Sequence, residues 1–151
     1  MNISKRLNKY EGYSGIYKSV GFEIKFLEGD SDRNSLIPYS DGHWVYYIFI
    51  CLGNLPNRVN PETFWLPNDY CYYEHEILNE IYFYGGITYY HKTCGFDDGQ
   101  EKIIKVGCDF NHGWDQDKYY TLVNIYVHVK KTIDSLYKLI PEYGSKGEIN
   151  E

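Results

Sequence analysis

The alternation of apolar and polar residues predicts several half-buried strands in the first two thirds of the chain. The clearest alternation runs from 17 to 27, where the apolar positions are Val20, Phe22, Ile24 and Phe26. A second alternation covers 104–110 and directs Asp109 away from the core face. The run at 43–52 is apolar almost throughout, which is typical of a strand buried on both faces. These three segments predict the central strands of a sheet.

The middle of the chain is less regular. Three of the five prolines fall within 53–70, so regular structure there should be short and broken. This segment carries Phe64 and Trp65, which must either pack down or cover something. Residues 76–83 fit both a helical turn and a strand. We favour a strand that ends at a Gly pair and resumes at 87–92.

Apolar residues at spacings of three and four predict one long C-terminal helix. They are Leu122, Ile125, Tyr126, Val129, Ile133, Leu136, Tyr137 and Ile140. Pro141 and Gly144 end this pattern. We therefore expect a single α+β domain over 1–151, with 1–12 and 145–151 flexible. It should contain an antiparallel sheet of four to six strands with the helix packed on one face, and the other face or one sheet end free to bind.

Composition and charge narrow the class of protein. With 151 residues, 43% of them hydrophobic, and a mean hydropathy of −0.52, the chain fits a soluble globular domain rather than a disordered or membrane protein. No secretory pattern begins it, so we expect a cytoplasmic protein. A net charge of −6 argues against sequence-independent nucleic-acid binding, which needs many Lys and Arg residues. Eighteen tyrosines and no alanine indicate AT-rich coding, a tyrosine-rich binding surface, or both.

The cysteines and histidines form no strong metal or disulfide pattern. We expect reduced, free thiols at Cys51, Cys71, Cys94 and Cys108. A zinc site from His91, Cys94, Cys108 and His112 follows no finger spacing, and the strand pattern buries Cys108 on the face opposite Asp109. A calcium loop starting at Asp109 lacks the required Gly and Glu. We therefore expect neither a metal ion nor a cofactor.

The densest polar stretch is GCDFNHGWDQD, which connects the last predicted strand to the helix. Its Asp109, His112 and Asp115 suit metal binding or acid–base chemistry, because imidazole and carboxylates serve both. The same residues, with Trp114, suit binding of an organic ligand near a helix N-terminus. In a purely structural interpretation, Asp115 or Asp117 caps the helix, His112 bonds to the backbone and Trp114 packs over the sheet edge.

A second constellation surrounds a Gly pair. It consists of Tyr84, Gly85, Gly86, Thr88 and Tyr89. Without a Cβ, the pair lets the backbone bulge or lets a ligand approach closely, and a plain hairpin turn is the alternative. Trp44 and His43 open a neighbouring predicted strand and could supply a wall for the same site.

Three motifs resemble a widespread family of small, mostly uncharacterised phage proteins. They are GHWVYYIFI at 42–50, GGITY at 85–89 and GCDFNHGWD at 107–115, and the resemblance covers about residues 20–137. The matching signature positions are Gly85, Gly86, Thr88, Tyr89, Asp109, His112 and Asp115. Relatives carry His and Cys where this chain has Tyr84 and Phe110, which weakens a metal or catalytic role for a second His or Cys. The resemblance implies a small phage protein that interferes with host defence.

Our leading hypothesis is a non-enzymatic binding protein, as a homo-oligomer, that sequesters a nucleotide-type immune signal in the cytoplasm of the infected host cell. The expected ligand-binding residues are Trp44, Tyr84, Gly85, Gly86, Thr88, Tyr89, Asp109, His112, Trp114 and Asp115. One alternative is a phosphodiesterase or hydrolase that uses Asp109, His112 and Asp115. Another is an inhibitor whose acidic, tyrosine-rich face docks on a host defence protein.

Overall fold

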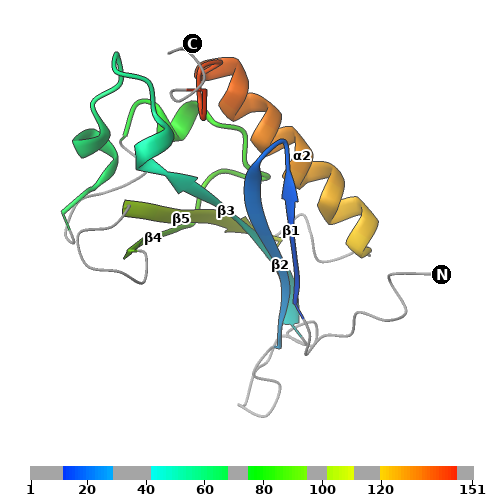
Figure 1. Ribbon diagram of the computed structural model, residues 1–151. Helices are drawn as coiled ribbons and strands as arrows, with labels where there is room; N and C mark the ends of the chain where they lie inside the picture. The colour runs from blue at the N-terminus through cyan, green and yellow to red at the C-terminus, as the bar shows by residue number, and fades with distance from the viewer. Residues whose placement is uncertain (1–11, 29–41, 68–74, 95–101, 111–119, 146–151) are drawn as a thin grey trace.

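The computed structural model describes residues 12–28, 42–67, 75–94, 102–110 and 120–145. They form a five-stranded antiparallel sheet, in the order β1-β2-β3-β5-β4, with one long helix across one face (Figure 1). The bounds are Tyr13–Tyr17 for β1, Val20–Glu28 for β2, Gly42–Cys51 for β3, Tyr89–Cys94 for β4, Lys102–Asp109 for β5 and Leu122–Leu139 for α2. The predicted α+β class, the strand number and the C-terminal helix are confirmed.

The described residues bear to different extents on the expectations about membrane spans, chain ends and cysteines. No helix within the described ranges is long and apolar enough to cross a membrane. Flexibility is predicted for 1–12 and 145–151, and all of these residues except 12 and 145 lie outside the described ranges. Neither Cys51 nor Cys108 is in a disulfide, which agrees with the prediction for these two residues, and Cys108 is buried.

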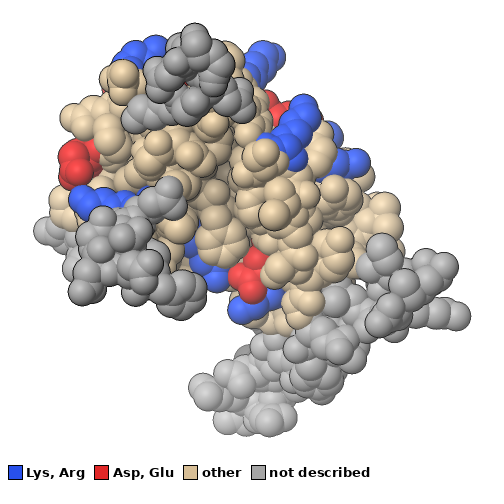
Figure 2. Space-filling model, viewed as in Figure 1, with Lys and Arg blue, Asp and Glu red and all other residues tan. Residues whose placement is uncertain are grey.

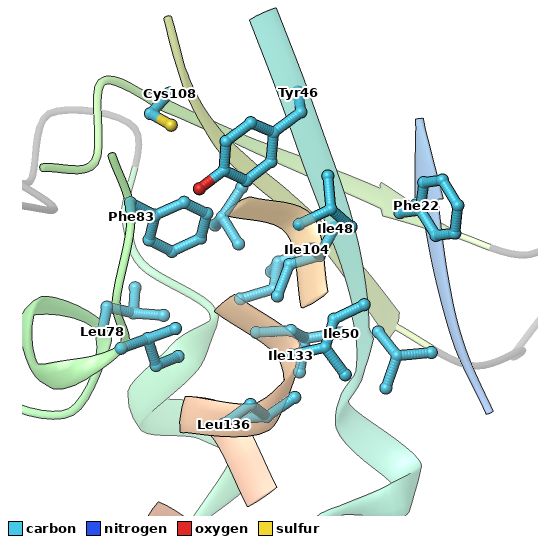
Figure 3. Close-up of a cluster of buried hydrophobic side chains, with 14 of the residues drawn as sticks. Phe22, Tyr46, Ile48, Ile50, Leu78, Phe83, Ile104, Cys108, Ile133 and Leu136 are labelled. Atoms are coloured by element: carbon cyan, nitrogen blue, oxygen red, sulfur yellow. The ribbon is translucent and has the colours of Figure 1, made fainter. Parts of the chain in front are cut away.

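The hydrophobic core lies between α2 and the sheet face that α2 covers (Figure 3). Even-numbered residues of the central strands point to this side and are buried, namely Phe22, Ile24, Tyr46, Ile48, Ile50, Ile104, Val106 and Cys108. They meet the buried stripe of α2, which consists of Leu122, Ile125, Val129, Thr132, Ile133 and Leu136. Because strand side chains alternate, the odd-numbered residues of these strands lie on the opposite face, which we call the outer face. Asp109 is among them, as predicted.

Helix α2 begins with a reciprocal cap. The Thr121 hydroxyl accepts a hydrogen bond from the Asn124 backbone N–H at 3.2 Å, and the Asn124 side chain accepts one from the Thr121 backbone N–H at 3.1 Å. The prediction that Asp115 or Asp117 caps this helix is therefore wrong. Thr121 directly precedes Leu122, the first residue of the helix. From this position its short side chain reaches the backbone N–H of Asn124, the third helical residue.

Strand β1 was not expected from the hydrophobic pattern. It pairs with β2 in a tight hairpin whose two turn residues, Lys18 and Ser19, both have positive φ angles of 51° and 70°. The strand predicted from residue 17 thus contains the turn, and β2 starts only at Val20. Contacts with α2 hold this unusual turn, because Lys18 Nζ lies 2.8 Å from the Asp134 carboxylate and Tyr137 donates a hydrogen bond to the Lys18 carbonyl.

In its described residues, 52–67 and 75–88, the segment between β3 and β4 contains only short helical turns. These are η1 (Leu52–Asn54), η2 (Pro61–Phe64) and η4 (Leu78–Glu80). Broken structure was predicted for 53–70, and Phe64 packs fully into the core. The strand predicted at 76–83 is wrong, because Leu78, Ile81 and Phe83 reach the core from η4 and the irregular chain that follows it. The strand does resume close to the predicted place, as β4.

Candidate functional site

The two candidate segments of the sequence meet at one end of the sheet. The Thr88 backbone N–H donates to the Gly107 carbonyl at 2.9 Å, and Tyr89 pairs with Gly107 across β4 and β5. Asp109 follows two residues later at the end of β5. The chain from the Gly pair therefore runs directly beside the start of the Asp109–Asp115 stretch. Three predicted site residues, His112, Trp114 and Asp115, lie outside the described residues.

The Gly pair forms an exposed turn at this sheet end. The Gly86 N–H donates to the Phe83 carbonyl at 2.9 Å, and both glycines have positive φ angles, 70° at Gly85 and 97° at Gly86. A four-residue turn with positive φ at its third residue favours glycine there. Nothing lies within 4 Å of the position that a Gly86 Cβ would occupy. The turn accounts for the glycines and leaves their backbone open to solvent.

The sheet divides the remaining predicted residues between its two sides. Tyr89 and Asp109 lie on the outer face by their register with Gly107 and Val45. Trp44 lies on the α2 side, where its ring meets Phe26 edge-on at 5.3 Å. Tyr84 also lies on the α2 side. Those of the ten predicted residues that the structure describes therefore do not form one continuous wall.

Four residues on the outer face form a compact group, which we call the outer-face cluster. They are Tyr47, Tyr89, Lys105 and Glu23. The Tyr47 and Tyr89 rings meet edge-on with centroids 4.8 Å apart. The Lys105 ammonium lies 4.3 Å from the Tyr47 ring centroid and 5.7 Å from that of Tyr89. It is also 3.1 Å from Glu23, which lies 3.7 Å from Lys25 on its other side. A cation held against aromatic rings is the chemical core of this cluster.

Gly107 lies beneath the outer-face cluster and permits it. Gly107 pairs with Tyr47 on one side and Tyr89 on the other. A Cβ at Gly107 would lie 2.1 Å from the Tyr46 carbonyl oxygen and 2.5 Å from Tyr47 Cδ1, so no larger residue fits. Burial, helped by the negative charges of nearby groups, raises the pKa of Tyr47 to about 12. Its phenol therefore stays protonated at neutral pH and can donate a hydrogen bond.

His43 adds a second chemical feature next to the cluster. It lies two residues before Val45, which pairs with Asp109, so His43 and Asp109 share the outer face. Partial burial lowers the pKa of His43, and the charge of Asp109 opposes this effect. The imidazole is consequently neutral at pH 7 and feels the field of a neighbouring carboxylate. This is the chemistry of a general base, and also of a hydrogen-bonding pair for a ligand.

On the α2 side, a group of rings packs around the same turn. Tyr84 stacks on Phe110 at 4.2 Å, and its hydroxyl lies 2.7 Å from that of Tyr120. Phe110 and Tyr120, the described residues on either side of 111–119, contact each other with centroids 4.8 Å apart. His128 Nδ1 lies 2.7 Å from the Tyr82 hydroxyl and its ring packs edge-on against Tyr84. These contacts join the turn, the end of β5 and the start of α2.

The zinc pattern considered above does not assemble. His91 lies on the outer face, opposite Lys105 in the register, whereas Cys108 is buried on the α2 side. Within the described part of the chain, no group of three or more His, Cys, Asp or Glu residues is placed to hold a metal ion.

A separate hollow of about 540 Å³ lies beside η2. Its lining includes Glu62, Trp65, His75 and Ile77. His75 is structural here, because its Nδ1 accepts from the Leu78 backbone N–H at 3.1 Å and its Nε2 lies 2.8 Å from the Thr63 carbonyl. Trp65 is partly buried. Lys92 and Lys102 lie 5.4 and 5.1 Å from its ring centroid.

Sequence reasoning missed Tyr47 and Lys105 as members of the site. Tyr47 lies in the apolar run of β3, where no alternation tells one face from the other. Lys105 did carry a signal, since it alternates with Ile104 and Val106 and must share a face with Asp109. Comparison with family models, curated proteins and solved structures finds no match to this chain.

Proposed function

We propose that this protein binds a nucleotide-type small molecule at the outer-face end of β3, β4 and β5, and holds it without converting it. The observation that carries the proposal is the outer-face cluster beside an exposed Gly–Gly turn. At this end of the sheet the outer face provides aromatic rings, a cation and a carboxylate at Asp109, and the adjoining turn provides exposed backbone. These are the groups that recognise a base, a phosphate and a ribose.

Each part of the ligand has a counterpart on this surface. Tyr89 is partly exposed, and its edge-on contact with Tyr47 fixes its ring as a stacking platform for a base. Lys105, 5.7 Å from the Tyr89 ring centroid, supplies a cation for a phosphate oxygen, and the Gly85–Gly86 turn shortly precedes β4 in the chain. Asp109 suits ribose hydroxyls or an exocyclic amino group, which donate hydrogen bonds to carboxylates.

Charge limits the class of nucleotide. Lys105 and Lys25 carry two positive charges, and Glu23 and Asp109 carry two negative ones. The local charges therefore cancel, and a phosphate must compete with Glu23 for Lys105. Figure 2 shows Lys and Arg groups dispersed among uncharged residues on the visible surface. Few positive charges are therefore available to bind phosphate. This favours a ligand whose phosphates each carry one negative charge, such as a cyclic nucleotide, over a triphosphate.

The resemblance to phage proteins extends the proposal to biology. On that basis the ligand is a nucleotide immune signal of the host, which the protein sequesters during infection. The tyrosine-rich, acidic composition suits this role no better than other binding roles, so the support here is the motif resemblance alone.

The test is recovery of the bound molecule. The protein is purified from bacterial cells incubated with a panel of cyclic mononucleotides and dinucleotides, then heated, and the released compounds are identified by mass spectrometry. Intact nucleotide supports sequestration. A cleaved product contradicts it and favours the hydrolase, while no nucleotide together with a co-purifying host protein favours the inhibitor.

A matched pair of variants then locates the site. Tyr89→Leu should weaken nucleotide binding roughly 5- to 150-fold in calorimetry, because base stacking on an aromatic ring contributes about 1–3 kcal/mol. Tyr126→Leu makes the same chemical change on α2, on the other side of the sheet, and should leave the affinity unchanged. Equal effects of the two variants would show that the ligand does not stack on Tyr89.

One observation favours the hydrolase as the second candidate. His43 shares the outer face with Asp109, and partial burial lowers its pKa, so the two groups could act together in acid–base chemistry. If the released nucleotide is cleaved, His43→Gln should abolish cleavage while Tyr89→Leu mainly raises KM. This split distinguishes an acid–base role for His43 from a binding role.

A further inference from the structure

Strand β1 forms one edge of the sheet and lacks the features that keep such edges unpaired. Among the described residues it pairs only with β2, and its sequence, YSGIY, contains neither a charged residue nor a proline. Ile16 is 75% exposed and Tyr13 39% exposed. Soluble proteins usually protect an edge strand with lysine, proline or a bulge, because its free backbone groups can pair with another strand.

The opposite edge shows the contrast. Strand β4 carries His91 and Lys92 in its middle, and Lys92 is a typical guard against edge pairing. Lys18 directly follows β1, but its ammonium is 2.8 Å from Asp134 and is drawn toward α2. The two edge strands of the sheet therefore differ: β4 carries a charged residue and β1 carries none.

We propose that β1 pairs antiparallel with β1 of a second copy of this chain, about a two-fold axis at Gly15. In this register Tyr13 faces Tyr17 of the partner subunit, and Ser14 faces Ile16 of the partner subunit. The strand is self-complementary, with an aromatic residue at each end, and the small Ser14 accommodates the larger Ile16. This pairing covers the exposed Ile16 side chains and continues the sheet through both copies.

The pairing has a consequence for the outer face. Ser14 pairs with Glu23 and Ile16 with Gly21, so both lie on the outer face of the sheet. The two copies would present their outer faces on the same side of one continuous sheet. A five-residue strand buries little surface, so the dimer should be weak, with dissociation in the micromolar range or above.

Sedimentation tests the proposal on the full chain. Wild-type protein, measured from about 10 to 500 µM, should shift from a mass near 17.9 kDa toward twice that value. The double variant Ser14→Lys/Ile16→Lys places like charges opposite each other and should weaken dimerisation at least about tenfold. Leu27→Lys adds a charge at another exposed aliphatic residue, on β2, and should leave dimerisation unchanged. If the wild-type protein stays monomeric throughout this range, the proposal is overturned. This holds even if a different protein pairs with β1.

Cross-linking tests the register. In the proposed pairing, Cys at position 14 of one copy faces Cys at position 16 of the other, within disulfide distance. A mixture of Ser14→Cys and Ile16→Cys proteins should therefore form a disulfide-linked dimer under mild oxidation, whereas each variant alone should form much less. Circular dichroism and thermal melting confirm that the variants are folded. Equal cross-linking in all three samples overturns the register and the two-fold axis at Gly15.

Discussion

A buried hydroxyl pair connects the core to the candidate site. The side chains of Tyr46 on β3 and Thr132 on α2 are fully buried, and their oxygens lie 2.7 Å apart. The Tyr46 hydroxyl also accepts a hydrogen bond from the Tyr84 backbone N–H at 3.2 Å. One oxygen thus holds the helix, the sheet and the Gly–Gly turn together. The perturbation to test is its removal in Tyr46→Phe.

The expected cost follows mainly from losing the hydrogen bonds to Thr132 and to the Tyr84 backbone. Each net hydrogen bond contributes about 1 kcal/mol, and a polar group left buried without a partner costs about 1–3 kcal/mol. Tyr84 N–H is only partly buried, and Thr132 can bond to its own helix backbone, so both costs fall at the lower end. We expect Tyr46→Phe to lower the free energy of unfolding by about 2–3 kcal/mol. Thr132→Val loses one bond and should cost about 1–2 kcal/mol.

Urea denaturation of the two single variants and the double variant gives the coupling between them. Because the double variant removes both partners of one bond, its cost should be about 1 kcal/mol less than the sum of the two single costs. Strict additivity of the two costs would show that the 2.7 Å contact contributes nothing. A cost for Tyr46→Phe below about 0.5 kcal/mol would refute the role of this hydroxyl as a link between three elements.

Three further predictions concern the backbone and pH. Gly107→Ala should destabilise the protein by more than about 3 kcal/mol, seen as lost soluble yield or a lower urea midpoint, because its Cβ would lie 2.1 Å from the Tyr46 carbonyl. Ser19→Gly should raise stability by up to about 1 kcal/mol in the same assay, since Ser19 has φ 70°. Lowering the pH from about 7.5 to about 5.5 should lower Tm, because burial and the charge of Lys131 lower the pKa of His128 in the folded protein. The unfolded chain therefore binds a proton at this histidine near pH 6.5, whereas the folded protein binds it only at lower pH. His128→Asn should reduce this pH dependence, and an unchanged slope would contradict it.

Hydrophobic periodicity predicted the elements that bury a single face. Strands β2 and β5 alternate between core and outer face, and α2 buries one stripe, so the sequence pattern and the packing coincide. The pattern failed where no single face is buried. β1 has exposed residues at most positions, and the core residues at 78–83 reach inward from irregular chain. In both cases the positions depend on neighbouring elements rather than on a local period.

The sequence indicated which segments of the chain meet at the candidate site, but not which face of the sheet each of their side chains occupies. The Gly pair and Asp109 meet at the same sheet end, which the motif spacing suggested. Trp44 and Tyr84 lie on the α2 side, and no sequence rule assigned them. Register decides this, because a shift of one residue in a strand moves every side chain to the other face. The sequence alone did not determine the pairing of β4 with β5.

Adjacent residues of β3 join stability and the proposed binding site. Tyr46 points into the core and holds Tyr84 through its hydroxyl, while Tyr47 points outward and packs over Gly107 beside Tyr89. The turn between Tyr84 and Tyr89 is therefore fixed at one end from inside and at the other end from outside. Tyr46→Phe should then weaken nucleotide binding although Tyr46 is buried on the α2 side, and measured affinities for this variant at a temperature where it is fully folded would test that coupling. An unchanged affinity would show that the outer-face cluster is positioned by β3, β4 and β5 alone.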